Sequence, residues 1–213
     1  MPTSVKRKLV YAFIDASNLF YGGEKSLGWK IDYKKLLKYL KDKYKVGKAF
    51  YYGGIETFGF EYSVLSEKSI DLKMLLKYLK SEIKKPKISD EKVILIGRGI
   101  KRAEFYLHLD QFGYELCLKP VKVFTDENGR QSKKANCDVD MTFDMMRYMG
   151  QYSGIVALTG DGDFAPVLCY LKKHSRTITI LARGERTAKE IKQLVGSDFR
   201  DFNYLREILR FIK

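Results

Sequence analysis

Two residue types that build many enzyme and metal sites are scarce in this chain of 213 residues. It contains two histidines, His108 and His174, so a zinc site or a histidine-based catalytic triad has little support. Its three cysteines, Cys117, Cys137 and Cys169, are far apart in the sequence and form no Cys-x-x-Cys pair. The sequence therefore indicates neither a disulfide framework nor a zinc ribbon.

Long hydrophobic runs are also missing. No apolar stretch approaches the ~20 residues that a helix needs to cross a bilayer. Basic residues precede an apolar run near the N-terminus, but this run, Leu9 to Ile14, is too short for the core of a signal peptide and leads into Asp15. We expect a soluble cytoplasmic protein with no membrane partner.

Acidic residues are outnumbered by basic ones, 26 against 40, which gives a formal net charge of +14. One interpretation is a polyanionic partner, most naturally a nucleic acid. The other is that lysines simply fill solvated helix faces, and we favour this second interpretation for the lysine-rich segment 67–92. The 45% hydrophobic content, with 15 Tyr and 13 Phe, is sufficient for a sizeable core and argues against global disorder.

Apolar patterning predicts strands that alternate with helices. Strands are expected at 8–14, 47–55, 91–97, 114–124, 154–160 and 176–182, and helices at 31–45, 63–85, 100–113, 138–151, 163–174 and 187–195. A polar segment with the turn pair Asn128-Gly129 precedes the 138–151 helix, and we expect Lys133 and Lys134 to lie there in a flexible loop. The alternation predicts an α/β fold, a three-layer sandwich with a mainly parallel central sheet.

Carboxylates follow two of the predicted strands. Asp15 ends the first strand, and Asn18 follows at the start of a helix. Asp161 and Asp163, in the stretch "TGDGDF", follow the buried strand 154–160. Because ligands in such folds bind beyond the carboxyl ends of the strands, these strand ends are where a functional site is expected.

The helix that precedes strand 154–160 adds more acidic residues. Asp138 lies near its first turn, and Asp140 and Asp144 are four residues apart on one face. Each aspartate also has a purely structural interpretation, since Asp163 and Asp138 are suitable helix caps and Asp144 suits a solvated surface. These interpretations do not explain why carboxylates gather at two strand ends, where they raise one another's pKa unless a cation joins them.

A hard divalent cation such as Mg²⁺ prefers oxygen ligands and leaves coordination positions open for a phosphate. An acidic, metal-loading pocket on a basic protein is what phosphodiester hydrolysis requires. Basic residues that could hold the nucleic-acid backbone are Lys133, Lys134, Arg98, Lys101 and Arg102.

Three stretches in this order, "YAFIDASNLFYG", "KKANCDVDMTFDMM" and "IVALTGDGDFAPVLCYLKKHSRTITIL", resemble the NYN domain of the LabA type, a branch of the PIN-like nuclease fold. The resemblance implies a Mg²⁺- or Mn²⁺-dependent ribonuclease that leaves a 5′-phosphate and a 3′-hydroxyl. It also implies the site residues. They are the catalytic residues Asp15, Asn18, Asp138, Asp161 and Asp163, and the metal ligands Asp15, Asp138, Asp161, Asp163 and Asp144.

Two departures from the family pattern are visible. Asn136-Cys137 stands where the family usually has Gly-Val. The stretch 56–100 is longer than a minimal domain of this type requires, so we expect one domain over 1–213 with an insertion around 56–100.

Other functions fit the same residues. A non-catalytic RNA-binding module of this fold would keep the RNA partner, most naturally single-stranded, without turnover. A phosphatase or phosphotransferase with Asp15 as nucleophile fits less well, because Ser17 stands where such enzymes commonly carry a second aspartate. Both a monomer and a homodimer agree with the sequence.

Overall fold

The structure of the chain is a computed structural model, and it describes residues 9–20, 25–62, 69–125 and 131–212. Contacts within the chain divide it into two compact units. The first combines Met1–Tyr51 with Asp138–Lys213, and the second is Tyr52–Cys137.

Six strands form one sheet in the order β3-β2-β1-β6-β7-β8. Four of these strands and the first part of a fifth belong to the first unit: β1 (Val10–Asp15), β6 (Gly154–Leu158), β7 (Thr177–Ala182), β8 (Phe199–Asp201) and, up to Tyr51, β2 (Val46–Ile55). Each neighbouring pair from β1 through β6 and β7 to β8 is parallel. Strand β8 was not predicted from the sequence, because its three residues are too few to show a pattern.

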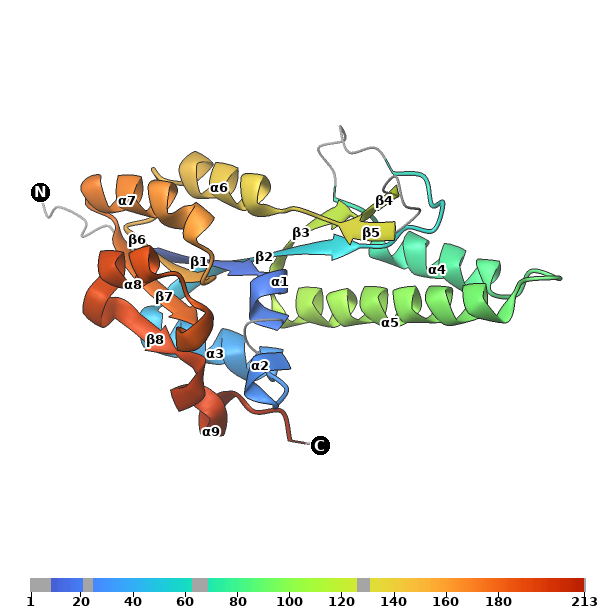
Figure 1. Cartoon of the computed structure of the whole chain (residues 1–213), viewed down its shortest axis with the longest axis horizontal. Coiled ribbons are helices and arrows are strands. Elements are labelled where there is room, and N and C mark those ends of the chain that lie inside the picture. Colours follow the sequence, from blue (N-terminus) through green and yellow to red (C-terminus); the bar gives the residue numbers. More distant parts are fainter. Residues whose placement is uncertain (1–8, 21–24, 63–68, 126–130, 213) are drawn as a thin grey trace, which may run out of the picture. The chain divides into compact units, whose positions relative to one another are not determined.

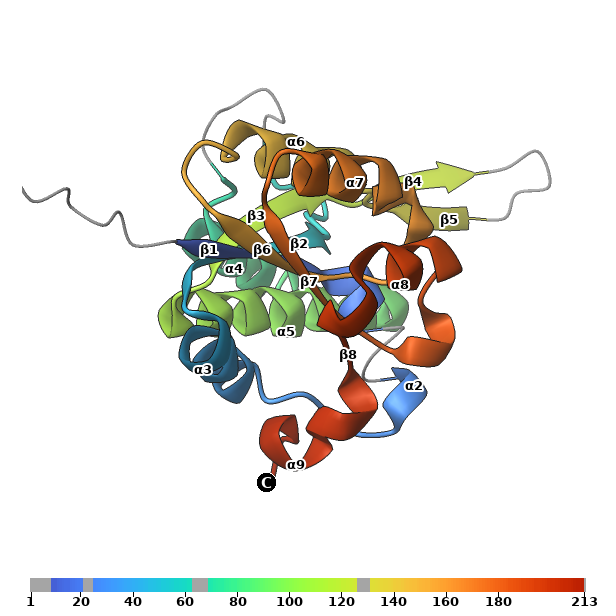
Figure 2. The same cartoon turned by 90° about the vertical axis from the view of Figure 1, so that its left-hand side faces the viewer.

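Helices flank the strands of the first unit. They are α1 (Ala16–Asn18), α2 (Lys25–Leu27), α3 (Tyr33–Tyr44), α6 (Asp138–Arg147), α7 (Ala165–Lys173), α8 (Lys189–Val195) and α9 (Arg206–Leu209). Short 3-10 helices lie at η2 (Gly162–Phe164), η3 (Gly184–Arg186), η4 (Gly196–Asp198) and η5 (Phe202–Leu205). Helices α6 and α7 lie on one face of β1 and β6, and α3 lies on the other (Figures 1 and 2). The predicted α/β fold with a mainly parallel central sheet is confirmed.

The core of the first unit lies against its central strands. All five residues of β6 are buried, as are the four middle residues of β1. Burial on both faces explains why these strands are continuous apolar runs rather than alternating ones. Phe13 of β1 and Phe50 of β2 stack with ring centroids 5.4 Å apart, and Leu36, Leu37 and Leu40 form the buried face of α3.

Helix α3 lies within the predicted helix 31–45, and Asp32 caps its start. The carboxylate of Asp32 accepts a hydrogen bond from the backbone N–H of Lys35 at 3.0 Å, which satisfies one of the amides that a helix leaves unpaired at its first turn.

The described part of the second unit contains two longer helices, three strands and the end of β2. Its elements are α4 (Leu72–Glu82), α5 (Asp90–Phe112), β3 (Glu115–Pro120), β4 (Lys122–Thr125) and β5 (Gln131–Lys134). Helices α4 and α5 pack side by side, and the hydroxyl of Tyr106 on α5 donates to the carbonyl of Gly54 at the end of β2, at 2.8 Å. Helix α4 begins later than the predicted 63–85 helix, and residues 63–68 lie outside the described residues.

The predicted strand at 91–97 is wrong, because these residues form the beginning of the 23-residue helix α5. Ser89 caps this helix by accepting from the N–H of Lys92, and Asp90 and Glu91 occupy its first turn. Gly97, which ends the predicted strand, lies inside this helix, and so does Gly99, where a Cβ would be 2.5 Å from the ring of Phe58. Two glycines within one helix therefore resembled the boundary between a strand and a helix.

The loop predicted to carry Lys133 and Lys134 is also corrected, because both residues lie in β5. Strand β5 pairs antiparallel with β4, with Lys134 opposite Lys122 and Lys133 opposite Val123. The predicted turn at Asn128-Gly129 lies outside the described residues.

No helix within the described ranges is long and apolar enough to cross a membrane. The expectation of one domain over 1–213 with an insertion around 56–100 stays a prediction.

Candidate functional site

The site is placed by the pairing of β1 with β6. These strands are parallel neighbours and pair from Val10 with Gly154 to Ile14 with Leu158. Because parallel strands in register end at the same edge of a sheet, the residues that follow Ile14 and Leu158 come together there. Residues that are far apart in the sequence thus meet at the carboxyl edge of the first unit.

Asp15 ends β1 and caps the short helix α1. Its Oδ1 accepts from the backbone N–H groups of Ser17 at 2.9 Å and Asn18 at 3.2 Å. Its second oxygen, Oδ2, accepts neither of these bonds. The cap therefore fixes the carboxylate at the strand end while one oxygen remains for another interaction.

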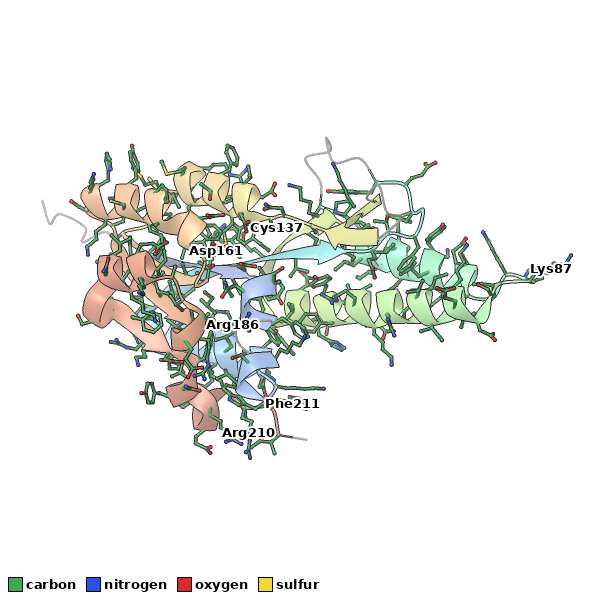
Figure 3. The ribbon with its side chains drawn as sticks, in the orientation of Figure 1. Lys87, Cys137, Asp161, Arg186, Arg210 and Phe211 are labelled. Atoms are coloured by element: carbon green, nitrogen blue, oxygen red, sulfur yellow. The ribbon has the colours of Figure 1, made fainter. Side chains whose placement is uncertain are left out.

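Asp161, labelled in Figure 3, repeats this arrangement after β6. Its Oδ1 accepts from the backbone N–H of Asp163 at 3.0 Å, and its own N–H donates to the hydroxyl of Thr159 at 3.2 Å. The residue that caps this turn is therefore Asp161, and the interpretation of Asp163 as the cap of the following helix is wrong. Helix α7 begins at Ala165 without a side-chain cap, with a proline in its first turn, and Asp163 is exposed.

Asn18 links the two turns. Its Oδ1 accepts from the backbone N–H of Gly160 at 3.1 Å, across a sequence separation of 142 residues. The sequence had placed Asn18 beside Asp15 with a role toward a ligand or water. The structure shows a direct contact from the Asp15 turn to the Asp161 turn.

Asp138 is the third carboxylate of this edge. It is the first residue of α6, where the positive end of the helix dipole favours a negative charge. Burial raises the pKa of Asp15, and together with the smaller effects of the negative charges of Asp138 and Asp161 it brings the pKa to about 6. The backbone amides of Asn18 and Ser17 act in the opposite direction. Three carboxylates from β1, the β6 turn and α6 therefore act on one another electrostatically.

These side chains do not form an assembled metal site. Among the residues that the structure describes, no group of three or more His, Cys, Asp or Glu side chains is arranged so that it could hold a metal ion. The chemistry of the donors nevertheless suits a hard divalent cation, because carboxylate oxygens are its preferred protein ligands.

Asp144 lies deeper in α6 than Asp138. It is buried, and its Oδ1 pairs with Nη2 of Arg147 at 2.8 Å, one turn further along the helix. Six residues separate Asp144 from Asp138, so the two side chains leave the helix about 120° apart. Its place among metal ligands stays a prediction.

The predicted nucleic-acid contacts belong to the second unit. Arg98, Lys101 and Arg102 are exposed on α5, and Lys133 and Lys134 are in β5. Their contact with RNA stays a prediction.

Sequence reasoning missed the residues that pack beneath the Asp161 turn. A Cβ at Gly160 would be 2.8 Å from the hydroxyl of Thr187, and the N–H of Ala188 donates to the carbonyl of Gly160 at 2.9 Å. A Cβ at Gly162 would meet the carboxylate of Glu190 on α8. The two glycines of "TGDGDF" were the available signal, since each allows close approach by another segment.

The comparisons with known proteins agree with this fold. The model of the NYN domain family matches residues 10–203. The low amplitude and bright protein LabA of Synechococcus elongatus is 27% identical over 201 residues, which cover 92% of this chain and 85% of that protein.

A crystal structure of a protein of unknown function from Vibrio parahaemolyticus has the same fold, with a TM-score of 0.59 and 16% identity over 92% of this chain and 93% of that one. The match to the family model covers most of the sequence. This chain therefore belongs to the NYN domain family.

Proposed function

We propose that this chain is a metal-dependent ribonuclease that uses Mg²⁺ or Mn²⁺ at the carboxyl edge of the first unit. The observation that carries the proposal is the meeting of the Asp15 and Asp161 turns at the ends of β1 and β6, where the N–H of Gly160 donates to Asn18. Membership of the NYN domain family supports it, because the motifs of this chain resemble PIN-like nucleases.

The raised pKa supports a cation at this edge for a physical reason. Burial and the neighbouring negative charges disfavour the ionised form of Asp15, so the ionised carboxylate opposes folding. A divalent cation between the three carboxylates would replace repulsion by attraction. Since the described side chains do not yet form a three-ligand set, ion binding would have to draw them together. Asp15, Asp138 and Asp161 are the proposed ligands, with Asp163 as a further one.

The residues of the chain have separate tasks in this proposal. Asp15 presents Oδ2 to the cation, while Oδ1 remains bonded to the amides of α1. Asn18 is a positioning residue, because its bond to Gly160 holds the Asp15 turn against the Asp161 turn. A bound divalent ion would polarise a phosphoryl oxygen and lower the pKa of a bound water. Hydrolysis would leave a 5′-phosphate and a 3′-hydroxyl on the RNA.

The test is cleavage of single-stranded RNA by the purified full chain, with Mg²⁺ or Mn²⁺ and with EDTA. Cleavage should require the metal and should be lost in Asp161→Asn. Asp140→Asn is the matched control. It removes an exposed negative charge from α6, and Asp140 is outside the proposed ligand set. Cleavage that persists in EDTA and in Asp161→Asn would disprove the proposal.

A second candidate is an RNA-binding module of this family without turnover. The observation that favours it is that the described carboxylates are not assembled as a three-ligand group. This candidate predicts RNA binding that falls with salt and survives Asp161→Asn, with no cleavage under any metal condition. Assays of the wild-type chain and Asp161→Asn with the same RNA therefore distinguish the two candidate functions.

A further inference from the structure

Helix α4 carries a row of lysines on its exposed side. Lys73, Lys77 and Lys80 lie on the helix, and Lys84 lies in the turn that follows it. At 100° per residue, these positions fall within an arc of about 60°, so they follow one line along the helix. All four side chains are exposed, and we refer to them as the α4 lysine row.

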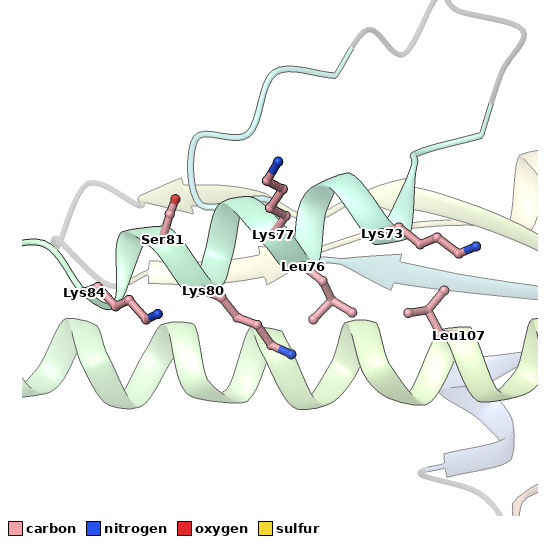
Figure 4. Close-up of a pocket in the computed structure, with 7 residues that line it drawn as sticks. All are labelled: Lys73, Leu76, Lys77, Lys80, Ser81, Lys84 and Leu107. Carbon is pink, nitrogen blue, oxygen red and sulfur yellow. The ribbon is translucent and has the colours of Figure 1, made fainter.

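The row borders a groove between α4 and α5 in the second unit. A cavity of about 530 Å³ lies there, lined by the row together with Leu76, Ser81 and Leu107. Figure 4 shows Leu76 and Leu107 facing each other between the two helices, and Lys80 and Lys84 pointing toward α5. The groove thus has an apolar floor and an ammonium-rich edge.

Few carboxylates neutralise the row. Lys80 pairs with Glu104 of α5 at 3.4 Å, and in the described part of the chain it is the only member of the row with such a partner. The only acidic residue within α4 itself, Glu82, is buried and pairs with Lys85 at 2.5 Å. The row therefore keeps most of its positive charge for a ligand.

Helix α3 shows that lysine spacing alone does not produce such a surface. Lys34, Lys38 and Lys41 have the same spacing as the first three members of the row, and all are exposed. There, Asp42 lies within the same helix and pairs with Lys38 at 2.5 Å, so each of the two sets has one lysine with a carboxylate partner. What distinguishes the α4 lysine row is that it lines the groove.

The chemistry of the groove selects the part of a nucleic acid that could bind. Ammonium groups attract phosphates as point charges, whereas binding to bases on a single strand relies on aromatic side chains for stacking. None of the seven described residues that line the groove is aromatic. The groove therefore suits a phosphate backbone and offers no stacking platform.

We propose that the α4 lysine row binds the phosphate backbone of single-stranded RNA without preference for base sequence. The proposal rests on the proposed function, since it supplies a binding surface for the same class of substrate, and it replaces the interpretation of this lysine-rich segment as a merely solvated face. The net charge of +14 agrees with a polyanionic ligand.

The test compares two full-length variants with the same change of charge. One carries Lys73→Gln, Lys77→Gln, Lys80→Gln and Lys84→Gln. The control carries Lys34→Gln, Lys38→Gln, Lys41→Gln and Lys43→Gln on α3. Glutamine is a good helix former, so both variants should fold, which circular dichroism checks. Binding of a fluorescent oligouridylate is measured in EDTA across about 50 to 200 mM salt.

In the α4 variant, the slope of log K against log salt should become shallower by about 2 to 3, because each phosphate contact on a single strand contributes about 0.7. Affinity near physiological salt should fall at least about tenfold, while the α3 control keeps most of its affinity. An equal loss in both variants would assign the effect to net charge and overturn the proposal, as would no loss in either.

Three further outcomes test the identity of the ligand and separate this proposal from the proposed ribonuclease. Phosphatidylserine vesicles that bind through the row while RNA binding is unaffected would overturn the assignment to RNA. If the wild-type chain binds RNA through the row but never cleaves it, the proposed ribonuclease fails while the row remains an RNA-binding surface. If the chain cleaves RNA and the α4 variant binds RNA as tightly as wild type, the proposal for the row is wrong while the proposed ribonuclease stands.

Discussion

The carboxylates of the first unit and the α4 lysine row of the second unit differ in how exposed their charges are and in which groups surround them. Asp15 is partly buried and held by backbone amides, and nearby carboxylates raise its pKa further. The lysines of the row are exposed on long side chains, and only one of them has a carboxylate partner among the described residues. The first group opposes folding, whereas the second has little effect on it.

This difference determines how informative each group is. A buried charge destabilises the fold unless something compensates it, so its presence points to a ligand. An exposed lysine is solvated and needs no ligand, so its presence in a sequence indicates little. For the lysine row, the informative observations are the groove, the neighbours and the contrast with α3, all of which require the structure.

The largest expected effect is on catalysis. Asp138→Asn removes a proposed ligand from the first turn of α6 and should lower kcat/KM for RNA cleavage at least about 100-fold, because loss of metal stabilisation costs several kcal/mol in the transition state. Steady-state kinetics of Asp138→Asn and Asp140→Asn measure the contrast. Equal rates for the two variants would remove Asp138 from the site.

The next effect is stabilisation by metal. A divalent ion at about 100 times its Kd should stabilise the folded chain by about 2.7 kcal/mol, which corresponds to roughly 5 to 10 °C in Tm for a chain of this size. The fourfold α4 variant should keep this shift, whereas Asp161→Asn should lose it. Thermal melts with and without Mn²⁺ separate the two regions, and a flat response in wild type would refute a metal site.

A smaller effect is expected at the contact between the two turns. Asn18→Ala removes the acceptor of the Gly160 amide and should lower the free energy of unfolding by about 1 to 2 kcal/mol. It should also weaken the shift caused by Mn²⁺, because the Asp15 turn loses its contact with the Asp161 turn. Urea unfolding with and without metal measures both quantities. An unchanged metal response would restrict Asn18 to a role in stability.

The smallest effect concerns pH. The pKa of Asp15 is about 6 in the folded chain and about 3.9 in an unfolded one, so the folded state binds more protons between these values. Stability therefore falls as pH rises from about 4 to 6. Asp15→Asn keeps an oxygen for the α1 amides and should raise Tm by a few degrees near pH 7.5 in EDTA.

The same substitution should have little effect near pH 4, where Asp15 is already neutral. Melting curves at the two pH values provide the measurement. A Tm that falls in Asp15→Asn at the higher pH would contradict the electrostatic account of this strand end.

Much of the fold was predictable because its signals are local. The apolar run that ends at Asp15 and the run before "TGDGDF" indicate strands buried on both faces, and the cap at Asp32 follows from residue type and position. Parallel strands share an edge, so the meeting of Asp15 with Asp161 followed from fold class alone.

The errors arose where a residue's role depends on a distant partner. Gly97 and Gly99 looked like the boundary between two elements, although Gly99 makes room for the ring of Phe58, which is distant in the sequence. Asp163 and Asp161 are both good caps by type, and only the geometry shows which one accepts the amide. Glu190 belongs to α8, which is separated from the Gly162 turn by α7, β7 and η3, and its approach to Gly162 leaves no pattern near "TGDGDF".

The bond from Gly160 to Asn18 also has a consequence for folding order. It spans 142 residues, so neither turn can reach its final position until β6 has been synthesised and has paired with β1. A nascent or truncated chain that ends before β6 carries Asp15 but no partner turn, and it should not cleave RNA. Hydrogen exchange at the Gly160 amide would report this assembly directly, because the amide becomes protected only once both turns are in place.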